Sequence, residues 1–456
     1  MTKKKESKMP MYFLSIALEN VKCFGSKQTL DLSNGKGAPA RWTLILGDNG
    51  VGKTTLLQLL ALMRPTEDPE SEKQKTDMIA IKATIDSFED NDEYERLLRA
   101  GKNEDLSVRI ELSNGEKLNV HSPKKGNILS YEVKAKSKDG KLTASTNVVG
   151  YLKNFNAPNV FAYSASRHMV SNNSDQSSLR DSVANLFSET GELYDAEEIL
   201  PNLDYKQLKQ IPRAKEDLIK VKALLVDLLP FVESAECIEI MGPSTITNFN
   251  TSGSVKIKMP TGIVALSSLS MGYMTMLAWA VDLAIRMLEK FPESDAPLEE
   301  PAVVIIDEID LHLHPKWQRD VREQLTSHFP NTQFICTAHS PLMAQSSEEE
   351  NIVVLKLENN EVHIINNRDL IKGWRVDQIL TSDLFGLTSA RSSEVEERVN
   401  ERRRILDKKK KTKDDLQELK ELDDTLSKLP TLESMEDENM MDLLREANKA
   451  IHGGKK

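Results

Sequence analysis

The sequence has few cysteines and no long apolar run. Its three cysteines, Cys23, Cys237 and Cys336, are odd in number, lie far apart and form no CxxC pair. This pattern argues against a disulfide framework and against a zinc ribbon, since both need paired or closely spaced cysteines. A reducing compartment suits such a chain best, and we expect a cytoplasmic protein.

No segment has the length and composition of a membrane span. Lysines occupy positions 3–5, but charged residues interrupt the stretch that follows, so we expect no signal peptide. The most apolar helix candidate, Met274 to Leu288, contains Asp282 and Arg286 and is too short to cross a bilayer. We therefore expect no membrane partner.

The charge balance is acidic. A net charge of −11 argues against a protein coated in positive charge for nucleic acid, although it leaves room for a local basic groove. With 456 residues, 39% of them hydrophobic, the chain is long enough to bury a large core and to form two or three domains.

Hydrophobic patterning predicts a chain that mixes strands and helices. Apolar runs of strand length predict strands at 12–18, 28–32, 42–46, 108–112, 117–120, 159–164, 302–306, 333–337, 352–357 and 361–365. Helical spacing predicts helices at 56–63, 218–229 and 272–290, one after Pro315, and a charged one whose leucines recur from 416 to 429. The Asn114-Gly115 and Asn359-Asn360 pairs predict hairpins, and the polar residues 65–76 predict an exposed loop. We expect 77–150 to be β-rich, 170–235 to be mostly helical and 236–265 to be strand-like.

Residues 47–54, GDNGVGKT, match the phosphate-binding pattern GxxxxGK[ST] between a buried strand and an apolar helix. The backbone N–H groups of such a loop and the helix N-terminus point at phosphate oxygens. Lys53 would neutralise the β- and γ-phosphates, and the Thr54 hydroxyl would hold Mg²⁺. The alternative is a Gly-rich turn before an ordinary helix. We expect ATP to contact Asn49, Gly50, Gly52, Lys53, Thr54 and Thr55.

A second motif, residues 303–308, reads VVIIDE. Four apolar residues indicate a strand buried on both faces, and its carboxyl end is where α/β sheets bind ligands. Asp307 would reach Mg²⁺ through water, and Glu308 would orient or deprotonate the attacking water. A buried strand that ends in acids is common, but the P-loop upstream favours the catalytic interpretation.

A third motif, residues 269–273, reads LSMGY and opens the predicted helix 272–290. Ser270 and the amides near Gly272 would form a second anion site at a helix N-terminus. The alternative is an ordinary helix cap by Ser270, which gives the same sequence. A fourth motif is a strand that ends in His339, and a lone histidine at such a place is more often structural than catalytic.

The order of these motifs resembles that of ABC ATPases, in the RecF/SMC/OLD-like (AAA_21) branch. That resemblance implies a head-to-tail homodimer in which the Ser270 loop of one subunit covers ATP·Mg²⁺ on the P-loop of the other. It also implies that His339 touches the γ-phosphate. Met271 departs from the family's second glycine, and Tyr273 stands at its Gln/Glu position.

Three shorter segments match the same branch. NVKCF at 20–24 resembles an element whose basic residue helps to bind nucleotide phosphate or nearby DNA, which points to Lys22. Arg167 follows the Q-loop position, where the family's glutamine is missing. DLHLHP at 310–315 resembles the D-loop, which implies that Asp310 lies at the dimer interface. Its HxH pair lacks a third metal ligand, so we favour the D-loop interpretation.

Residues 373–387, GWRVDQILTSDLFGL, resemble the C-terminal segment of AAA-type ATPases from bacterial anti-phage systems, the PtuA family of Septu systems and its retron-associated relatives. That family implies a small HNH nuclease (PtuB-like) as partner. The sequence contains no acidic DxD after His339 and no HNH cluster of its own. The helical region after Arg391 is a candidate docking surface for the partner. Its basic runs at 402–404 and 408–411, with Lys413, leave two alternatives open: contact with DNA or RNA, or a solvated helix face.

We therefore predict an α/β P-loop NTPase, an ABC-type ATPase head with a β-rich N-terminal lobe, a helical lobe and a C-terminal helical appendage. The expected parts are the N-terminal ATPase lobe 1–170, the helical insert and strands 171–265, the lobe 266–390 with the signature and hydrolytic motifs, and the appendage 391–456. The expected function is a slow, Mg²⁺-dependent ATPase switch that controls a partner nuclease, with a possible larger assembly. The alternative is a RecF-like repair ATPase that binds DNA itself; the missing Q-loop glutamine counts against a transporter ATPase.

Overall fold

The computed structural model describes residues 10–67, 81–83, 106–114, 128–138, 141–148, 157–166, 168–169, 182–187, 192–229, 231–241, 255–347, 350–366, 371, 373–382, 384–387, 389–408, 410–427 and 429. The chain divides into two compact units, Met1–Ile379 and Leu380–Lys456. Three of the predictions made above fall outside the described residues: the strand 117–120, the loop from 68 to 76, and Arg167.

A six-stranded sheet forms the centre of the first unit. Its order is β18 (Glu361–Asn366), β17 (Asn351–Glu358), β3 (Trp42–Gly47), β16 (Thr332–Thr337), β15 (Ala302–Ile306) and β9 (Val160–Tyr163). All neighbours are parallel except β17 and β18. The strands β9, β15 and β16 are buried along their whole length, as continuous apolar runs covered on both faces should be. The order places β16 between the P-loop strand β3 and the acid-bearing strand β15.

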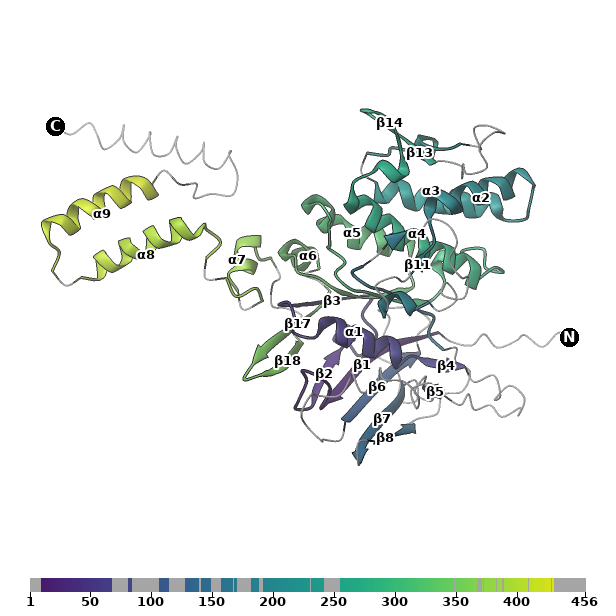
Figure 1. Ribbon diagram of the computed structural model, residues 1–456, viewed down its shortest axis with the longest axis horizontal. Coiled ribbons are helices and arrows are strands. Elements are labelled where there is room, and N and C mark those ends of the chain that lie inside the picture. The colour runs from purple at the N-terminus through teal and green to yellow at the C-terminus, as the bar shows by residue number, and fades with distance from the viewer. Residues whose placement is uncertain are drawn as a thin grey trace. The chain divides into compact units, whose positions relative to one another are not determined.

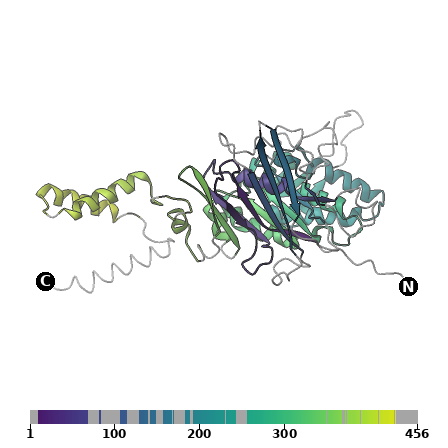
Figure 2. The ribbon, with the colours of Figure 1, turned by 90° about the horizontal axis from the view of Figure 1, so that it is seen from below.

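A second, antiparallel sheet lies on one side of the central sheet together with α1 (Lys53–Leu62) (Figure 1). Its order is β2 (Gln28–Asp31), β1 (Met11–Glu19), β6 (Leu106–Asn114), β7 (Ile128–Lys138) and β8 (Lys141–Val148). Figure 2 shows β6, β7 and β8 as long blue strands side by side. Apolar residues of β1, β6, α1 and the central sheet form one buried core. This sheet is the predicted β-rich lobe.

The strand predicted after Asn114-Gly115 is the wrong partner, although β6 does end at Asn114 and pairs antiparallel with the next described strand, β7. In the structure β6 has β1 on one edge and β7 on the other, and Ser113 pairs with Ile128. Both edges of β6 are thus occupied along the strand, so the turn signal does not lead directly into its partner. The loop predicted at 65–76 is wrong at its start, because β4 (Pro65–Glu67) pairs with β5 (Ile81–Ala83).

Helices cover the other side of the central sheet (Figure 1). They are α2 (Ala196–Leu208), α3 (Ala214–Leu228), α4 (Met271–Lys290), α5 (Pro315–His328) and α6 (Pro341–Ser346). The predicted strand-like region contains β12 (Ile238–Ile240), β13 (Val255–Met259) and β14 (Gly262–Ala265), which lead into α4. A short parallel pair, β10 (His168–Met169) and β11 (Glu192–Leu193), contacts α4.

The helix α4 is the core of the helical lobe. By length and composition it is the one helix in the described part of the chain that could cross a membrane, yet 72% of its most apolar window is buried inside the protein. Trp279 and Asp282 are both fully buried on it. Helix α4 is therefore a core helix of the protein.

The second unit contains two helices that pack on each other, α8 (Ser393–Asp407) and α9 (Lys413–Leu426). The short α7 (Val376–Leu380) lies at the boundary between the units. Thr412 and Asp415 form a capping box at the start of α9, which satisfies backbone N–H groups of its first turn. The α/β P-loop NTPase fold with a helical appendage is thus confirmed.

Candidate nucleotide-binding site

Lys53 begins α1 at the end of the P-loop and is buried. Its Nζ donates to the carbonyl oxygens of Gly47 at 2.8 Å and Asp48 at 2.9 Å. Burial lowers the pKa of Lys53, and the carboxylates of Asp307 and Glu308 oppose that shift. The Lys53 ammonium group lies at the N-terminus of α1. Backbone N–H groups and positive charge at this place favour a bound anion.

Gly52 caps α1 and touches the turn that contains Lys22. It has a φ of 89°, and a Cβ at this position would lie 2.4 Å from Cys23 Sγ, so only glycine fits. Cys23 Sγ also contacts Val51 O at 3.6 Å. The turn is tight, with Lys22 at a φ of 44°. The structure thus brings the 20–24 segment against the P-loop, while the role of Lys22 stays a prediction.

Thr54, Asp307 and Thr337 converge from three neighbouring elements. Thr54 Oγ1 donates to Asp307 Oδ2 at 2.6 Å, and Thr337 Oγ1 donates to Asp307 Oδ1 at 2.6 Å. Because β3, β16 and β15 are parallel neighbours, their carboxyl ends meet at one edge of the sheet. Hydroxyl and carboxylate oxygens are the ligands that Mg²⁺ prefers, so Thr54 and Asp307 fit the predicted metal.

Glu308 and His339 face each other beside this cluster. Their closest atoms, Glu308 Oε1 and His339 Nε2, are 3.9 Å apart, and each side chain is 34% exposed. Glu308 has a φ of 48°, a strained conformation that costs on the order of 1 kcal/mol and is common at functional sites. Its N–H donates to Thr337 Oγ1 at 2.7 Å. The buried Nε2 of His339 has no hydrogen-bond partner in the described part of the chain, which leaves it for a ligand.

The D-loop segment folds back on His339. Asp310 Oδ2 accepts a hydrogen bond from the His339 N–H at 2.9 Å. His314 caps α5, because its Nδ1 accepts from the Lys316 N–H at 3.3 Å. Among the described residues no group of three metal-ligating side chains occurs, and His312 and His314 belong to none. His314 thus has a structural role as a helix cap, and this role requires no metal.

The LSMGY motif at 269–273, called the signature turn below, lies at the start of α4. Ser270 is exposed and precedes the helix, but its side chain makes no capping bond. Met271 is 66% exposed. Gly272 lies against His312, since a Cβ at 272 would be 2.2 Å from the His312 carbonyl oxygen. The Ser270 hydroxyl therefore does not cap its own helix. The anion-site interpretation requires this, because the hydroxyl must be available to a phosphate.

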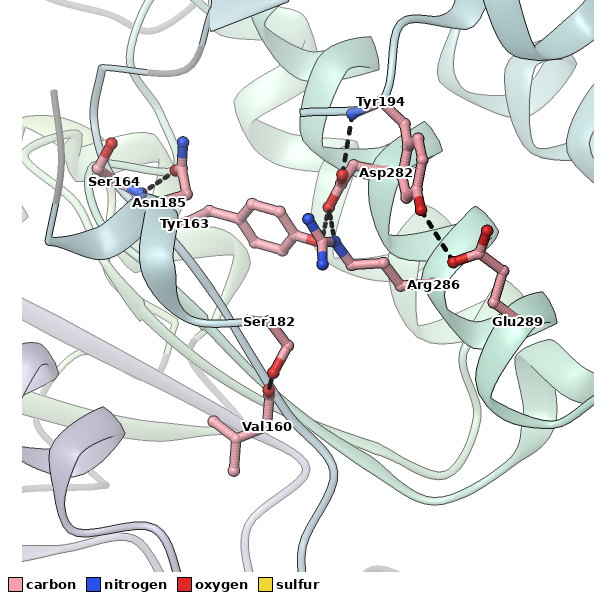
Figure 3. A network of polar contacts seen from close by, with 9 residues as sticks. All are labelled: Val160, Tyr163, Ser164, Ser182, Asn185, Tyr194, Asp282, Arg286 and Glu289. Atoms are coloured by element: carbon pink, nitrogen blue, oxygen red, sulfur yellow. Dashed lines mark hydrogen bonds and ion pairs between the residues drawn. The ribbon is translucent and has the colours of Figure 1, made fainter. Parts of the chain in front are cut away.

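A buried polar network connects this helix to the central sheet (Figure 3). The Tyr163 hydroxyl donates to Asp282 Oδ2 at 2.9 Å, and the Tyr194 N–H donates to Asp282 Oδ1 at 3.0 Å. Arg286 pairs with the same carboxylate at 2.6 Å. Burial raises the pKa of Asp282, and the Arg286 guanidinium opposes that shift. The carbonyl oxygen of Tyr163 accepts from the Asp307 N–H at 2.9 Å, so one residue joins α4 to the metal-binding strand.

Sequence reasoning missed three of these residues as parts of the site: Thr337, Cys23 and Tyr163. Thr337 ends a buried strand between the two motif strands, and a polar residue at that place was the available signal. Cys23 gave no signal, because its contact with Gly52 depends on how two distant segments pack. Tyr163 lies 119 residues from Asp282, so their pairing has no local pattern.

Comparison with known proteins identifies the family of the chain. A family model described as "AAA domain, putative AbiEii toxin, Type IV TA system" matches residues 43–344, from the P-loop strand to the helix after His339. The chain belongs to this family, AAA_21. The expected AAA_21 resemblance is confirmed.

Two relatives of this AAA_21 chain are named as Septu and retron proteins. The Septu protein PtuA of Bacillus mycoides is 27% identical over 360 residues, which cover 78% of this chain and 42% of PtuA. The retron Ec83 probable ATPase of Escherichia coli is 43% identical over 93 residues, 20% of this chain and 17% of that protein. The chain spans less than half the length of either relative. These matches confirm the resemblance to Septu and retron ATPases.

Among solved structures, the SMC head bound to the C-terminal winged-helix domain of ScpA is 15% identical, with a TM-score of 0.44. The matched region covers 79% of this chain and 98% of the SMC head chain.

Proposed function

We propose that this chain binds ATP with Mg²⁺ and hydrolyses it as a slow switch. The observation that carries the proposal is the convergence of Thr54, Asp307 and Thr337 at 2.6 Å, beside Glu308 and His339. A P-loop threonine bonded to the acid that follows β15 is the donor set of a nucleotide-bound magnesium ion.

Each residue has one task in the proposed reaction. Lys53 and the loop amides of Asn49, Gly50, Gly52 and Thr55 bind the phosphates, and Lys22 adds positive charge from the adjacent turn. Thr54 and Asp307 hold Mg²⁺, which when bound neutralises charge on the β- and γ-phosphates.

Glu308 and His339 would act at the γ-phosphate. Glu308 accepts a proton from the attacking water or orients it, and its exposure leaves room for that water. His339 donates a hydrogen bond to the γ-phosphate from Nε2, which makes no hydrogen bond to the described residues and lies 3.9 Å from Glu308 Oε1. Their separation of 3.9 Å allows both to contact one γ-phosphate and its water.

We also propose that two copies close head to tail around two ATP molecules. The exposed Ser270 makes no bond to its own helix, so its hydroxyl and the α4 N-terminus suit a γ-phosphate on the partner's P-loop. ADP lacks the γ-phosphate contacts, so hydrolysis would open the dimer.

In the cell, we propose a cytoplasmic ATPase of an anti-phage system that controls or delivers a small HNH nuclease. The similarity to Septu and retron proteins supports this role. Direct DNA binding by the appendage has less support, because several of its cations are paired within the unit: Arg402 with Asp423, Arg404 with Glu401, and Lys408 with Asp415. In each of these ion pairs the acidic side chain competes with a phosphate for the same cation.

The activity is tested by ATP turnover and mass measurement of the purified chain. We expect Mg²⁺-dependent hydrolysis and a shift from monomer to dimer with ATP. Asp307→Asn should abolish the hydrolysis, whereas Asp227→Asn, a change at a half-exposed carboxylate of α3, should not. Equal hydrolysis by Asp307→Asn and the wild type would overturn the proposal.

The cellular role is tested by co-expression with the protein that the neighbouring reading frame encodes, followed by phage plaque counts. Protection that needs both proteins and an intact Glu308 is expected. Salt-sensitive, ATP-dependent DNA binding by the chain alone, with no need for a partner, would favour the RecF-like alternative.

A further inference from the structure

Tyr273 stands at the signature position where the resembled family has Gln or Glu, but its ring is packed within its own protomer. The Tyr273 and Trp317 ring centroids are 4.2 Å apart at 82°, and those of Tyr273 and Phe231 are 4.9 Å apart at 79°. Both are edge-to-face contacts, a favourable geometry for aromatic pairs. The ring thus joins the start of α4 to α5 and to the loop that follows α3.

The backbone makes a second contact at the same place. Gly272 lies directly on the carbonyl of His312, where even a methyl group would clash at 2.2 Å. His312 has a φ of 63°, so the D-loop is held in a strained conformation at the contact. The signature turn and the D-loop of one protomer are therefore in direct backbone contact.

From the D-loop the contacts continue to the hydrolytic residues. The Leu311 N–H donates to Glu308 O at 3.0 Å, and Asp310 accepts from the His339 N–H at 2.9 Å. Trp317, the partner of Tyr273, is itself tied to the D-loop, because its N–H donates to His314 O at 2.8 Å. A continuous series of contacts thus runs from Tyr273 to Glu308 and His339 in the same chain.

We propose that Tyr273 is a positioning residue that couples the two ATP sites of the dimer. This inference rests on the proposed head-to-tail arrangement. Each signature turn there covers the partner's ATP, while Glu308 and His339 of the same chain act on the other ATP. Tyr273 and Trp317 transmit the docking of the signature turn to the D-loop, which sets Glu308 and His339 for hydrolysis.

The contact depends on an aromatic ring and not on a hydroxyl group or an amide. No hydrogen bond of the Tyr273 hydroxyl contributes to the series above, so phenylalanine should replace tyrosine. Glutamine, the residue that the family resemblance puts here, has no ring to pack on Trp317. The proposal therefore predicts that the family's own residue fails at this position.

The test separates the rate of hydrolysis from binding and dimerisation. With saturating ATP and fully dimeric protein, Tyr273→Ala and Tyr273→Gln should lower kcat on the order of ten- to a hundred-fold, as small misplacements of catalytic groups do. Affinity for a non-hydrolysable ATP analogue and the dimer mass should not change. Tyr273→Phe should restore the wild-type kcat, and Tyr205→Ala, at an exposed tyrosine of α2, is the matched control.

A double-mutant cycle with Trp317→Leu adds a readout that a general loss of stability would not give. If both residues act through one contact, the double variant should be no slower than Tyr273→Ala alone. A folded Tyr273→Gln with undiminished kcat overturns the inference, and so does Tyr273→Ala that loses dimerisation in place of turnover. Wild-type protein without ATP hydrolysis would instead overturn the proposed function.

Discussion

At the scale of residues, the site is defined by the two hydroxyl groups that bond to Asp307. Thr54 has a role in a motif that the sequence shows. Thr337 lies in the strand that leads to His339, but its bond to Asp307 is found only because β16 lies between β3 and β15. Motifs predict residues whose chemistry is local to a loop. They cannot predict a partner that the order of strands brings to the same edge.

The first prediction concerns Lys53. Lys53→Ala should abolish ATP binding, because the variant loses the only P-loop side chain that carries positive charge to the β- and γ-phosphates. Isothermal titration with ATP and Mg²⁺ measures this, and Lys36→Ala, an exposed lysine outside the loop, is the control. Normal ATP affinity of Lys53→Ala would discredit the P-loop assignment.

The second prediction concerns Glu308. Glu308→Gln keeps the size of the side chain but cannot accept the proton of water, so it should bind ATP and hydrolyse it about 100-fold or more slowly. The uncleaved γ-phosphate should hold the dimer closed, which light scattering after size-exclusion chromatography would show. Turnover at the wild-type rate would remove Glu308 from its role.

At the scale of elements, the position of α4 decides whether the signature turn can work. The sequence predicts α4 and the strands of the central sheet well, because continuous apolar runs and helical spacing are strong local signals. It does not predict what fixes α4 to the sheet, because Tyr163 and Asp282 come from distant segments. The Asn114-Gly115 signal shows a further limit, because it predicts that the chain turns back after β6 but not that the strand paired with β6 is β7.

The third prediction concerns Asp282. Asp282→Ala should lower the free energy of unfolding by about 3–5 kcal/mol, because it leaves the mostly buried Arg286 without its counter-ion. Urea unfolding followed by circular dichroism measures the change. Glu289→Gln, which alters the exposed bond to Tyr194, should cost less than about 1 kcal/mol. Equal losses for the two variants would show that the network does not anchor α4.

At the scale of the whole molecule, the proposed switch needs two chains. Each chain carries a P-loop and a signature turn, and a head-to-tail dimer uses one from each for every ATP. A variant defective at Lys53 and a variant defective at Ser270 should therefore both be inactive alone, for different reasons.

The most direct measurement is to mix these two variants. In an equal mixture of Lys53→Ala and Ser270→Arg, each mixed dimer holds one complete site and neither homodimer holds any. ATP hydrolysis should then return to about a quarter of the wild-type rate if the chains pair at random, and to at most about half if only mixed dimers close around ATP. A mixture as inactive as its two components would contradict an ATP site shared between Lys53 of one chain and Ser270 of the other.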